Sequence, residues 1–222
     1  MHTARELPPM PARIAKLPVA RGYPVPWFVQ WFGLKPDFRV VDSRKVDKAV
    51  KENRCFVCGE KFLPGEPYAF VIGPMCAVNR VDAEPPVHHE CGEWSIKACP
   101  FLSRPHMNRR EDDMPEGTRE AAGEMIKRNP GVTVLWLTMS YTIARVHNGR
   151  LFDLGEPISV AAFKEGRPAT PEELRDSVLS GLPALRDAAR SDGYTGLALL
   201  NMQLEVASRV LGVNLDNPVT AP

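Results

Sequence analysis

Hydrophobic and polar residues in the first third of the chain predict two short strands and a helix. The runs WFVQWF (27–32) and FRVVD (38–42) are rich in aromatic and β-branched residues, and GLKPD between them is typical of a hairpin turn. Asp42 or Ser43 then provides an N-cap for a helix whose apolar positions share one face, namely Val46, Ala49 and Val50. We therefore expect a hairpin and an amphipathic helix that leads to Cys55.

The central part of the chain predicts a module over about 54–105, made of a tight turn, a hairpin, a loop and a helix. CFVCGEKF forms the turn, YAFVIG is a strand and ECGEWSIKAC is helical. A charged linker follows, and 118–128 is predicted to be a helix that ends before Asn129-Pro130-Gly131. VTVLWLTM and YTIARV indicate strands, and HNGR indicates a hairpin turn into LFDLG, so we expect a second small antiparallel sheet.

The C-terminal quarter of the chain changes to a helical period. Thr170, Pro171 and Glu173 have the spacing of a capping box with proline at the first helical position. One apolar stripe follows, interrupted by Gly181 and Pro183, and a second has a/d spacing and consists of Leu197, Leu200, Leu204, Ala207 and Leu211. These patterns predict two or three short helices packed on the sheet.

Composition narrows the classes of protein that the chain can represent. It has 222 residues, enough for one large domain or two small ones, and 28 basic side chains against 27 acidic ones. A net charge of +1 creates no global field for polyanions, so any contact with nucleic acid must be local. No run reaches the roughly 18 apolar residues of a membrane span, and the N-terminus lacks the apolar segment of a secretory signal. The expected location is the cytoplasm.

Four residues have the spacing of a zinc site: Cys55 and Cys58, then a gap of 29 residues, then His88 and Cys91. Thiolate and imidazole are ligands that zinc prefers, and a gap of two residues lets both members of a pair reach one ion. All five cysteines lie between positions 55 and 99, and their odd number fits a reducing compartment better than a disulfide framework. The alternative is that these cysteines are small buried hydrophobic residues.

Three neighbouring residues leave alternatives open. Cys76 could replace His88 as the fourth ligand, although it has no partner at a spacing of two residues. Cys99 lies about two helical turns beyond Cys91 and is expected to be packed rather than ligated. His89 is expected to face solvent or to donate to a carboxylate such as Glu84 or Glu90.

The ligand pattern resembles the treble-clef zinc fold and the C-x2-C…H-x2-C half of LIM-type fingers, over roughly 40 residues. The gap of 29 residues is longer than in LIM fingers, and only the four ligands carry over. The segments PVPWFV, CFVCGE, FVIGPMC…HHECGEW and EGRPAT are also similar to a family of uncharacterised proteins of bacteria and their phages. That resemblance implies that the loop around Asn79, Arg80 and Glu84 is a specific surface, unless Pro85 and Pro86 make it a rigid support for His88.

A closed zinc site favours a zinc-stabilised binding protein that targets nucleic acid or a protein complex. Nucleic acid is indicated by a basic segment beside Trp94 and Phe101 whose members are Lys97, Arg104, Arg109 and Arg110, with Asn79 and Arg80 as further candidates. The acidic EDD that follows weakens this patch, and a solvated face is the alternative. A protein partner is indicated by the stripe from Leu197 to Leu211, although such a stripe is more often plain core.

The runner-up function is a metal-dependent nuclease of the HNH type, because that family combines a treble clef with a histidine that activates water. His89, Asn79 and His106 would take these roles. The fit is poor, because HNH nucleases place a His-rich pair where this chain has Tyr68 and Phe70. No catalytic residue is assigned.

The predicted fold class is α+β, with a zinc treble-clef module, small antiparallel sheets and a C-terminal helical segment. The predicted parts are an extended proline-rich arm at 1–26, the hairpin, helix and zinc module at 27–110, and a small sheet with C-terminal helices at 111–222. The arm is expected to extend away from the domain or to lie on it as a coat. No membrane partner is expected.

Overall fold

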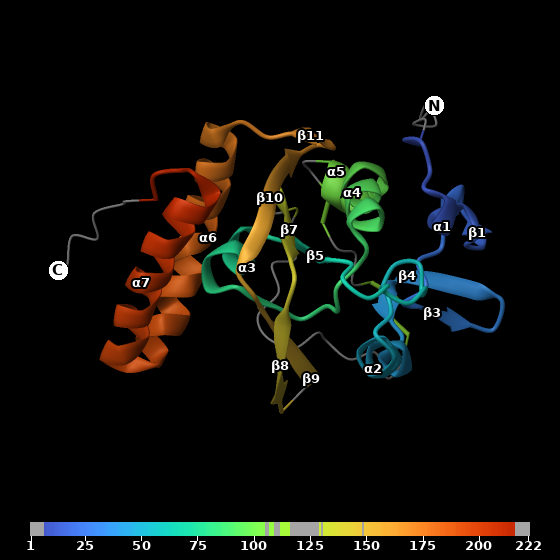
Figure 1. The fold of residues 1–222 in the computed structure, drawn as a ribbon, viewed down its shortest axis with the longest axis horizontal. Helices are drawn as coiled ribbons and strands as arrows, with labels where there is room; N and C mark the ends of the chain where they lie inside the picture. The colour runs from blue at the N-terminus through green and yellow to red at the C-terminus, as the bar shows by residue number, and fades with distance from the viewer. Residues whose placement is uncertain are drawn as a thin grey trace.

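A four-stranded antiparallel sheet runs through the middle of the molecule (Figure 1). The computed structural model describes residues 7–104, 107–108, 112–115, 129, 131–147 and 149–215. The strand order is β11-β10-β7-β5, where β5 is Tyr68–Ile72, β7 is Thr133–Thr138, β10 is Pro157–Lys164 and β11 is Arg167–Pro168. The sequence predicts β5 and β7 but not the other two strands. The α+β class with small antiparallel sheets is confirmed.

Side chains of this sheet alternate between two hydrophobic cores, one on each face. Phe70, Val134 and Trp136 belong to one core, while Ala69 and Leu135 belong to the other. Because both faces are covered, β7 is an almost unbroken apolar run instead of an alternating one. The second face is covered by α4 (His89–Ala98) and α5 (Pro100–Ser103), as Figure 1 shows.

Two long C-terminal helices cover the first face, α6 (Pro171–Ser191) and α7 (Gly193–Leu211), with the short α3 (Pro74–Asn79) between them and the sheet. The capping box at Thr170 is confirmed. The expected break at Gly181 and Pro183 is wrong, because α6 continues through both residues. Gly181 instead allows a close approach, since a Cβ there would lie 2.9 Å from Cγ of Met75 in α3.

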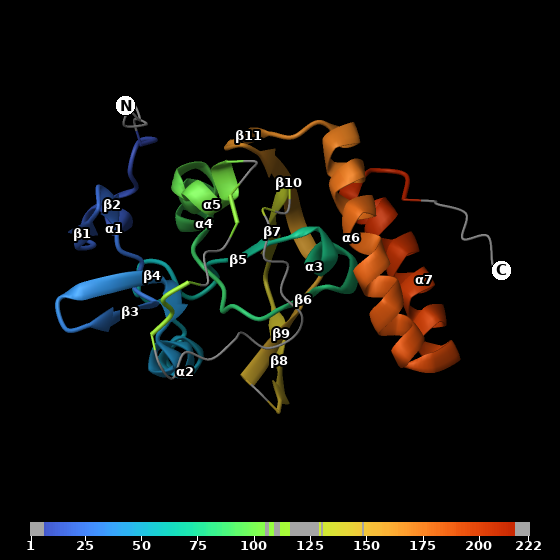
Figure 2. The ribbon, with the colours of Figure 1, turned by 180° about the vertical axis from the view of Figure 1, so that it is seen from behind.

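The N-terminal region lies at the opposite end of the molecule from α6 and α7 (Figure 2). The hairpin is β3 (Val29–Phe32) and β4 (Lys35–Val41), followed by α2 (Ser43–Glu52) with Asp42 as its N-cap, as predicted. Before them lie α1 (Ala12–Ala15) and the two-residue strands β1 (Val19–Ala20) and β2 (Tyr23–Pro24). Ile14 of α1 is fully buried against the cysteine module, so this part of the arm is a coat.

A second sheet has the strand order β6-β9-β8, with β6 at Val81–Asp82, β8 at Tyr141–Val146 and β9 at Gly149–Leu154. The hairpin of β8 and β9 is the predicted one, although its turn residue Asn148 lies outside the described residues. β6 joins from the loop before the second ligand pair. That loop therefore contributes a strand to the sheet.

The structure connects the two main parts predicted at 27–110 and 111–222. β5, before the expected boundary at 110, forms a ladder with β7, which lies after it. The sheet therefore crosses that boundary. The predicted helix at 118–128 lies outside the described residues. Among the residues that the structure describes, no helix has the length and apolar character of a membrane span.

Candidate metal centre

The first ligand pair sits in a tight turn that the backbone holds closed. The N–H of Cys55 donates to the carbonyl of Glu60, and the N–H of Gly59 donates to the carbonyl of Cys55. Gly59 has φ of +77°, and a Cβ there would lie 2.6 Å from Cγ of Trp27. Glycine is therefore required at this position both by its backbone conformation and by the indole ring that packs on the turn.

The second pair lies at the start of α4, where His88 is the N-cap residue and Cys91 is in the first turn. Val87 exchanges two backbone hydrogen bonds with Ala69 of β5, and the carbonyl of Pro86 accepts from the N–H of Phe56. Pro85 and Pro86 are both buried. The segment is thus fixed between β5 and the first turn, which supports the interpretation that the two prolines aim His88 at the cysteines.

The four predicted ligands meet at one point. Their ligand atoms, three Sγ and one imidazole nitrogen, all lie within 4.8 Å of one another, and all four residues are buried. Nδ1 of His88 lies 3.3 Å from Sγ of Cys58, so Nδ1 is the ring nitrogen that faces the sulfur atoms. Ligands of a tetrahedral zinc lie about 3.5–3.8 Å apart. The cluster therefore matches a tetrahedral site to within about 1 Å.

The three thiols influence one another strongly because they share a buried space. Burial acts to raise the pKa of Cys55, but hydrogen bonds from Cys58, Cys91 and two backbone N–H groups outweigh it and hold that pKa well below its usual value. Hydrogen bonding to Cys55 and Cys58 raises the pKa of Cys91. The thiolate form of Cys55 is thus stabilised, while Cys91 is held in its protonated form. A bound cation would allow all three to ionise together, so the donor set fits a metal ion.

The carboxylate of Glu66 lies beside the imidazole nitrogen of His88 that faces away from the cysteines. Nε2 of His88 is buried, has no hydrogen-bond partner among the described residues, and lies 3.5 Å from Oε2 of Glu66. The N–H of Leu63 donates to the same oxygen at 2.9 Å, while Arg13 donates to Oε1 at 3.0 Å. Phe62 packs on the imidazole with ring centroids 4.4 Å apart. Sequence reasoning missed Glu66 and Arg13, because neither has a motif spacing to the ligands.

The neighbouring candidates lie elsewhere. Cys76 is in α3 and packs against the core on the other side of the sheet, so it is not part of the cluster and His88 is the fourth member. Cys99 is the residue between α4 and α5 and is also outside the cluster. His89 is exposed on α4, in agreement with one of the two expectations for it.

The loop candidates make contacts within the protein. Oδ1 of Asn79 accepts from the N–H of Val81. Arg80 ends α3 in the left-handed conformation, forms two hydrogen bonds of 2.7 Å with Glu156, and lies 5.3 Å from the ring centroid of Trp136. These contacts fix the loop to the sheet.

The basic segment is described only in part. Lys97 forms an ion pair with Glu93 one turn earlier on α4, and Arg104 is exposed after α5. Arg109, Arg110 and His106 lie outside the described residues. The role of this segment in binding stays a prediction.

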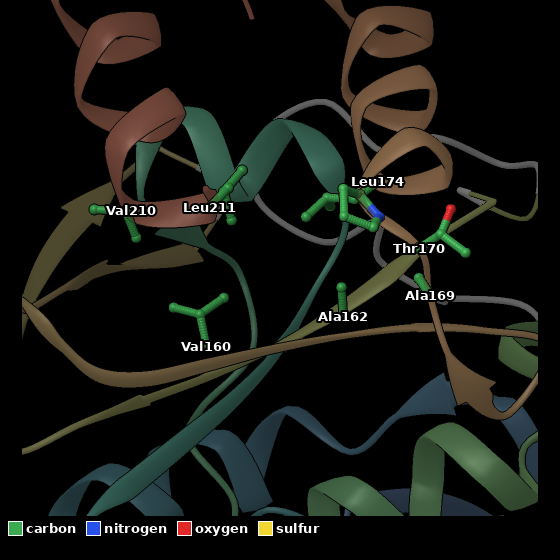
Figure 3. A pocket seen from close by; sticks show the side chains of 8 residues that line it. Val160, Ala162, Ala169, Thr170, Leu174, Val210 and Leu211 are labelled. Atoms are coloured by element: carbon green, nitrogen blue, oxygen red, sulfur yellow. The ribbon is translucent and has the colours of Figure 1, made fainter. Parts of the chain in front are cut away.

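The stripe on α7 packs mainly inward. Leu200 and Ala207 are buried in the core on the first face of the sheet, and Leu204 and Leu211 pack against that core. A depression lies between the end of α7, the start of α6 and β10, and Figure 3 shows Val160 and Ala162 of the strand below Val210 and Leu211 of the helix. Thr170 is the one residue in its lining with a polar side chain, and its hydroxyl caps α6. The depression offers no set of converging polar groups.

Comparisons with protein-family models, with curated proteins and with solved structures give no match for this chain. What supports a metal site in this chain is therefore the geometry of the cluster itself. Among the residues that the structure describes, it is the one group of three or more His, Cys, Asp or Glu side chains placed to hold a metal ion.

Proposed function

We propose that Cys55, Cys58, His88 and Cys91 bind one zinc ion and that the surrounding module is a variant of the treble clef. The donor set of three thiolates and one imidazole is a usual one for structural zinc, and the four groups are buried and mutually close. The first pair sits in a knuckle and the second on the first turn of α4. In place of a full hairpin, the module has the bridge between Ala69 and Val87.

The ion in such a site supports structure. Four protein ligands complete a tetrahedral shell and leave no position for a reactive water, whereas catalytic zinc keeps one position open. The chain is therefore proposed to be a zinc-stabilised binding protein whose target is nucleic acid or a protein complex. The observation that carries the zinc assignment is the convergence of four buried ligand atoms within 4.8 Å. Among the described residues, which do not include His106, no contact favours the nuclease alternative.

Metal analysis of the purified full chain tests this proposal. We expect about one equivalent of zinc per chain, and visible d–d absorption of tetrahedral cobalt after Co²⁺ replaces it. Cys58→Ser should lose most of the metal, whereas Cys99→Ser should keep it, because Cys99 lies outside the cluster. A wild-type chain with less than about half an equivalent of zinc, whose metal content does not change in Cys58→Ser, would overturn the proposal.

A further inference from the structure

The near-zero net charge hides an uneven distribution of charge along the chain. Residues 1–61 hold 12 of the 28 basic side chains but only 6 of the 27 acidic ones. This segment therefore has an excess of six positive charges, and the rest of the chain has an excess of five negative ones. A total charge of +1 therefore does not exclude a local positive field near the N-terminal hairpin and α2.

Helix α2 concentrates part of this excess on one face. Arg44, Lys48 and Lys51 follow one another at intervals of four and three residues, and all three are exposed. The apolar side of the helix points inward: Ala49 and Val46 pack in the core around the cysteines, and Val50 packs against the core on the first face of the sheet. The basic side therefore faces solvent.

The acidic residues near this helix are already paired. Asp47 pairs with Arg150 of β9, Glu52 pairs with Arg54 at 2.7 Å, and Asp42 pairs with Arg44 at 2.9 Å. Within the described part of the chain, Lys48 and Lys51 have no acidic group within ion-pair distance. The two lysine charges are thus available to an external anion.

The β8–β9 hairpin extends the positive surface. The ion pair between Asp47 and Arg150 places this hairpin beside α2, and Arg145 of β8 lies directly opposite Arg150 in the ladder. Asp47 balances the charge of Arg150, so the uncompensated charge of this pair is that of Arg145. Arg145 is exposed and, among the described residues, has no ion-pair partner. Asp112 and Asp113 lie beside Arg39 of β4, since their backbone carbonyls accept from its guanidinium.

We propose that this surface, called the α2 face, binds the phosphate backbone of a nucleic acid. Lys48, Lys51 and Arg145 supply its uncompensated charge, and Arg44 and Arg150, which pair with Asp42 and Asp47, border it. The proposal rests on the proposed function, because it identifies the target of the zinc-stabilised protein as nucleic acid and names the surface. Lys45 is not included, because its Nζ donates to the carbonyl of Val29 and lies 5.9 Å from the ring centroid of Trp27.

The chemistry of the α2 face favours a phosphate polymer over a lipid surface. Helices that lie on membranes insert an apolar side among the lipids, whereas the apolar residues of α2 are occupied inside the protein. Lysine and arginine contacts to phosphates hold a nucleic acid without reading its bases. We therefore expect binding that depends strongly on salt and little on sequence.

Fluorescence anisotropy of the zinc-loaded full chain with a labelled duplex of about 20 bp, and with one of its strands, tests the proposal at about 50–200 mM salt. The affinity for the duplex should fall with salt at a log-log slope of about −0.9 for each phosphate contacted. The variant Lys48→Gln with Lys51→Gln should reduce the slope by about 1.8 and the affinity at about 0.1 M salt by roughly 60-fold. Glutamine keeps good helix propensity, so the fold should persist.

The matched control is Arg190→Gln with Arg209→Gln on the C-terminal helices, which removes the same charge on the other side of the central sheet. This control should bind as tightly as wild type. The proposal is overturned by absence of salt-dependent binding in wild type, by equal losses in the two double variants, or by binding to phosphatidylserine vesicles in place of the duplex. It is also overturned if Lys97→Gln with Arg104→Gln produces the loss that we assign to the lysines of α2.

Zinc content is measured on each of these preparations. A chain that contains zinc but does not bind the duplex contradicts the α2 face and leaves the metal proposal intact. A chain that binds the duplex through Lys48 and Lys51 but contains no zinc contradicts the metal proposal alone.

Discussion

Glu66 places Oε2 3.5 Å from Nε2 of His88, on the side of the ring opposite the nitrogen that faces Cys58. Histidine ligands of metals usually direct their second nitrogen at a carboxylate or carbonyl, which fixes the tautomer and the orientation of the ring. If Nδ1 binds the ion, Nε2 carries the proton and points at Glu66. Arg13 and the N–H of Leu63 hold this carboxylate in place. Arg13 thus adds a polar contact between the N-terminal arm and the candidate metal centre to the packing of Ile14.

Glu66→Ala should therefore weaken zinc binding by about 10- to 100-fold, the range found when such supporting groups are removed. Glu66→Gln should lose less, because its amide oxygen can still accept from Nε2. Competition with a chromogenic chelator measures both. Glu90→Ala is the control, since Glu90 also lies near Arg13, at 3.5 Å, but is not the carboxylate beside His88. Equal losses in Glu66→Ala and Glu90→Ala would show that only overall charge matters.

Ile14 tests whether the described part of the arm belongs to the folded unit. Its side chain has no exposed surface and packs in the core that contains Cys55, Cys58 and Trp94. Ile14→Ala should lower the free energy of unfolding by about 2–5 kcal/mol, because it leaves a cavity in that core. Val19→Ala, in the same arm but 67% exposed, should change it by less than about 0.5 kcal/mol. Urea unfolding measures both variants, and similar values for the two would contradict the packing of α1.

Local signals in the sequence predicted some features well. Asp42 and Thr170 cap their helices through neighbours two or three residues away, and the ligand spacing is also a short-range pattern. Contacts that depend on distant segments were not predictable in the same way. The ladder of β5 with β7 joins residues more than 60 positions apart, and Arg13 reaches Glu66 across 53 positions. No periodicity within either partner specifies such a pairing.

Physical reasons also explain why the sequence did not predict β10 and α3. β10 contains Pro157 and two adjacent alanines, so its pattern of apolar residues is weak, and it is a strand because it pairs with β7. The short helix α3 has only six residues and is stabilised by packing between the sheet and α6. α6 continues through Gly181 in spite of the weak helix propensity of glycine, and the missing side chain leaves room for Met75 of α3.

Gly59→Ala tests two constraints on the turn that holds Cys55 and Cys58, namely the left-handed backbone at Gly59 and its contact with Trp27. Gly59 has φ of +77° and faces Trp27, whereas Gly33 has φ of +60° and open space around it. Alanine at Gly33 should cost on the order of 1–2 kcal/mol for its left-handed backbone alone. Alanine at Gly59 should cost clearly more, because Trp27 must also move. Urea unfolding compares the two, and an equal cost would mean that Trp27 yields without penalty.

Removal of the metal should change the environment of Trp94. This indole lies one turn after Cys91, is 8% exposed, and donates from Nε1 to the carbonyl of Pro8 at 3.3 Å. Without a cation, the buried thiols cannot all ionise, and the turn with Cys55 and Cys58 loses its link through the metal to Cys91 of α4. Chelation at neutral pH should therefore shift tryptophan emission to longer wavelength and release the contact with Pro8.

Four tryptophans contribute to that emission, so Trp94→Phe identifies the source. The part of the shift that disappears in this variant belongs to Trp94, and Trp136, buried on the other side of the sheet, should contribute little. Returning about one equivalent of zinc should restore the spectrum, because ligand binding and folding of the module are coupled. Emission that stays the same after all metal has been removed would mean that the packing of α4 against the arm is stable without the ion.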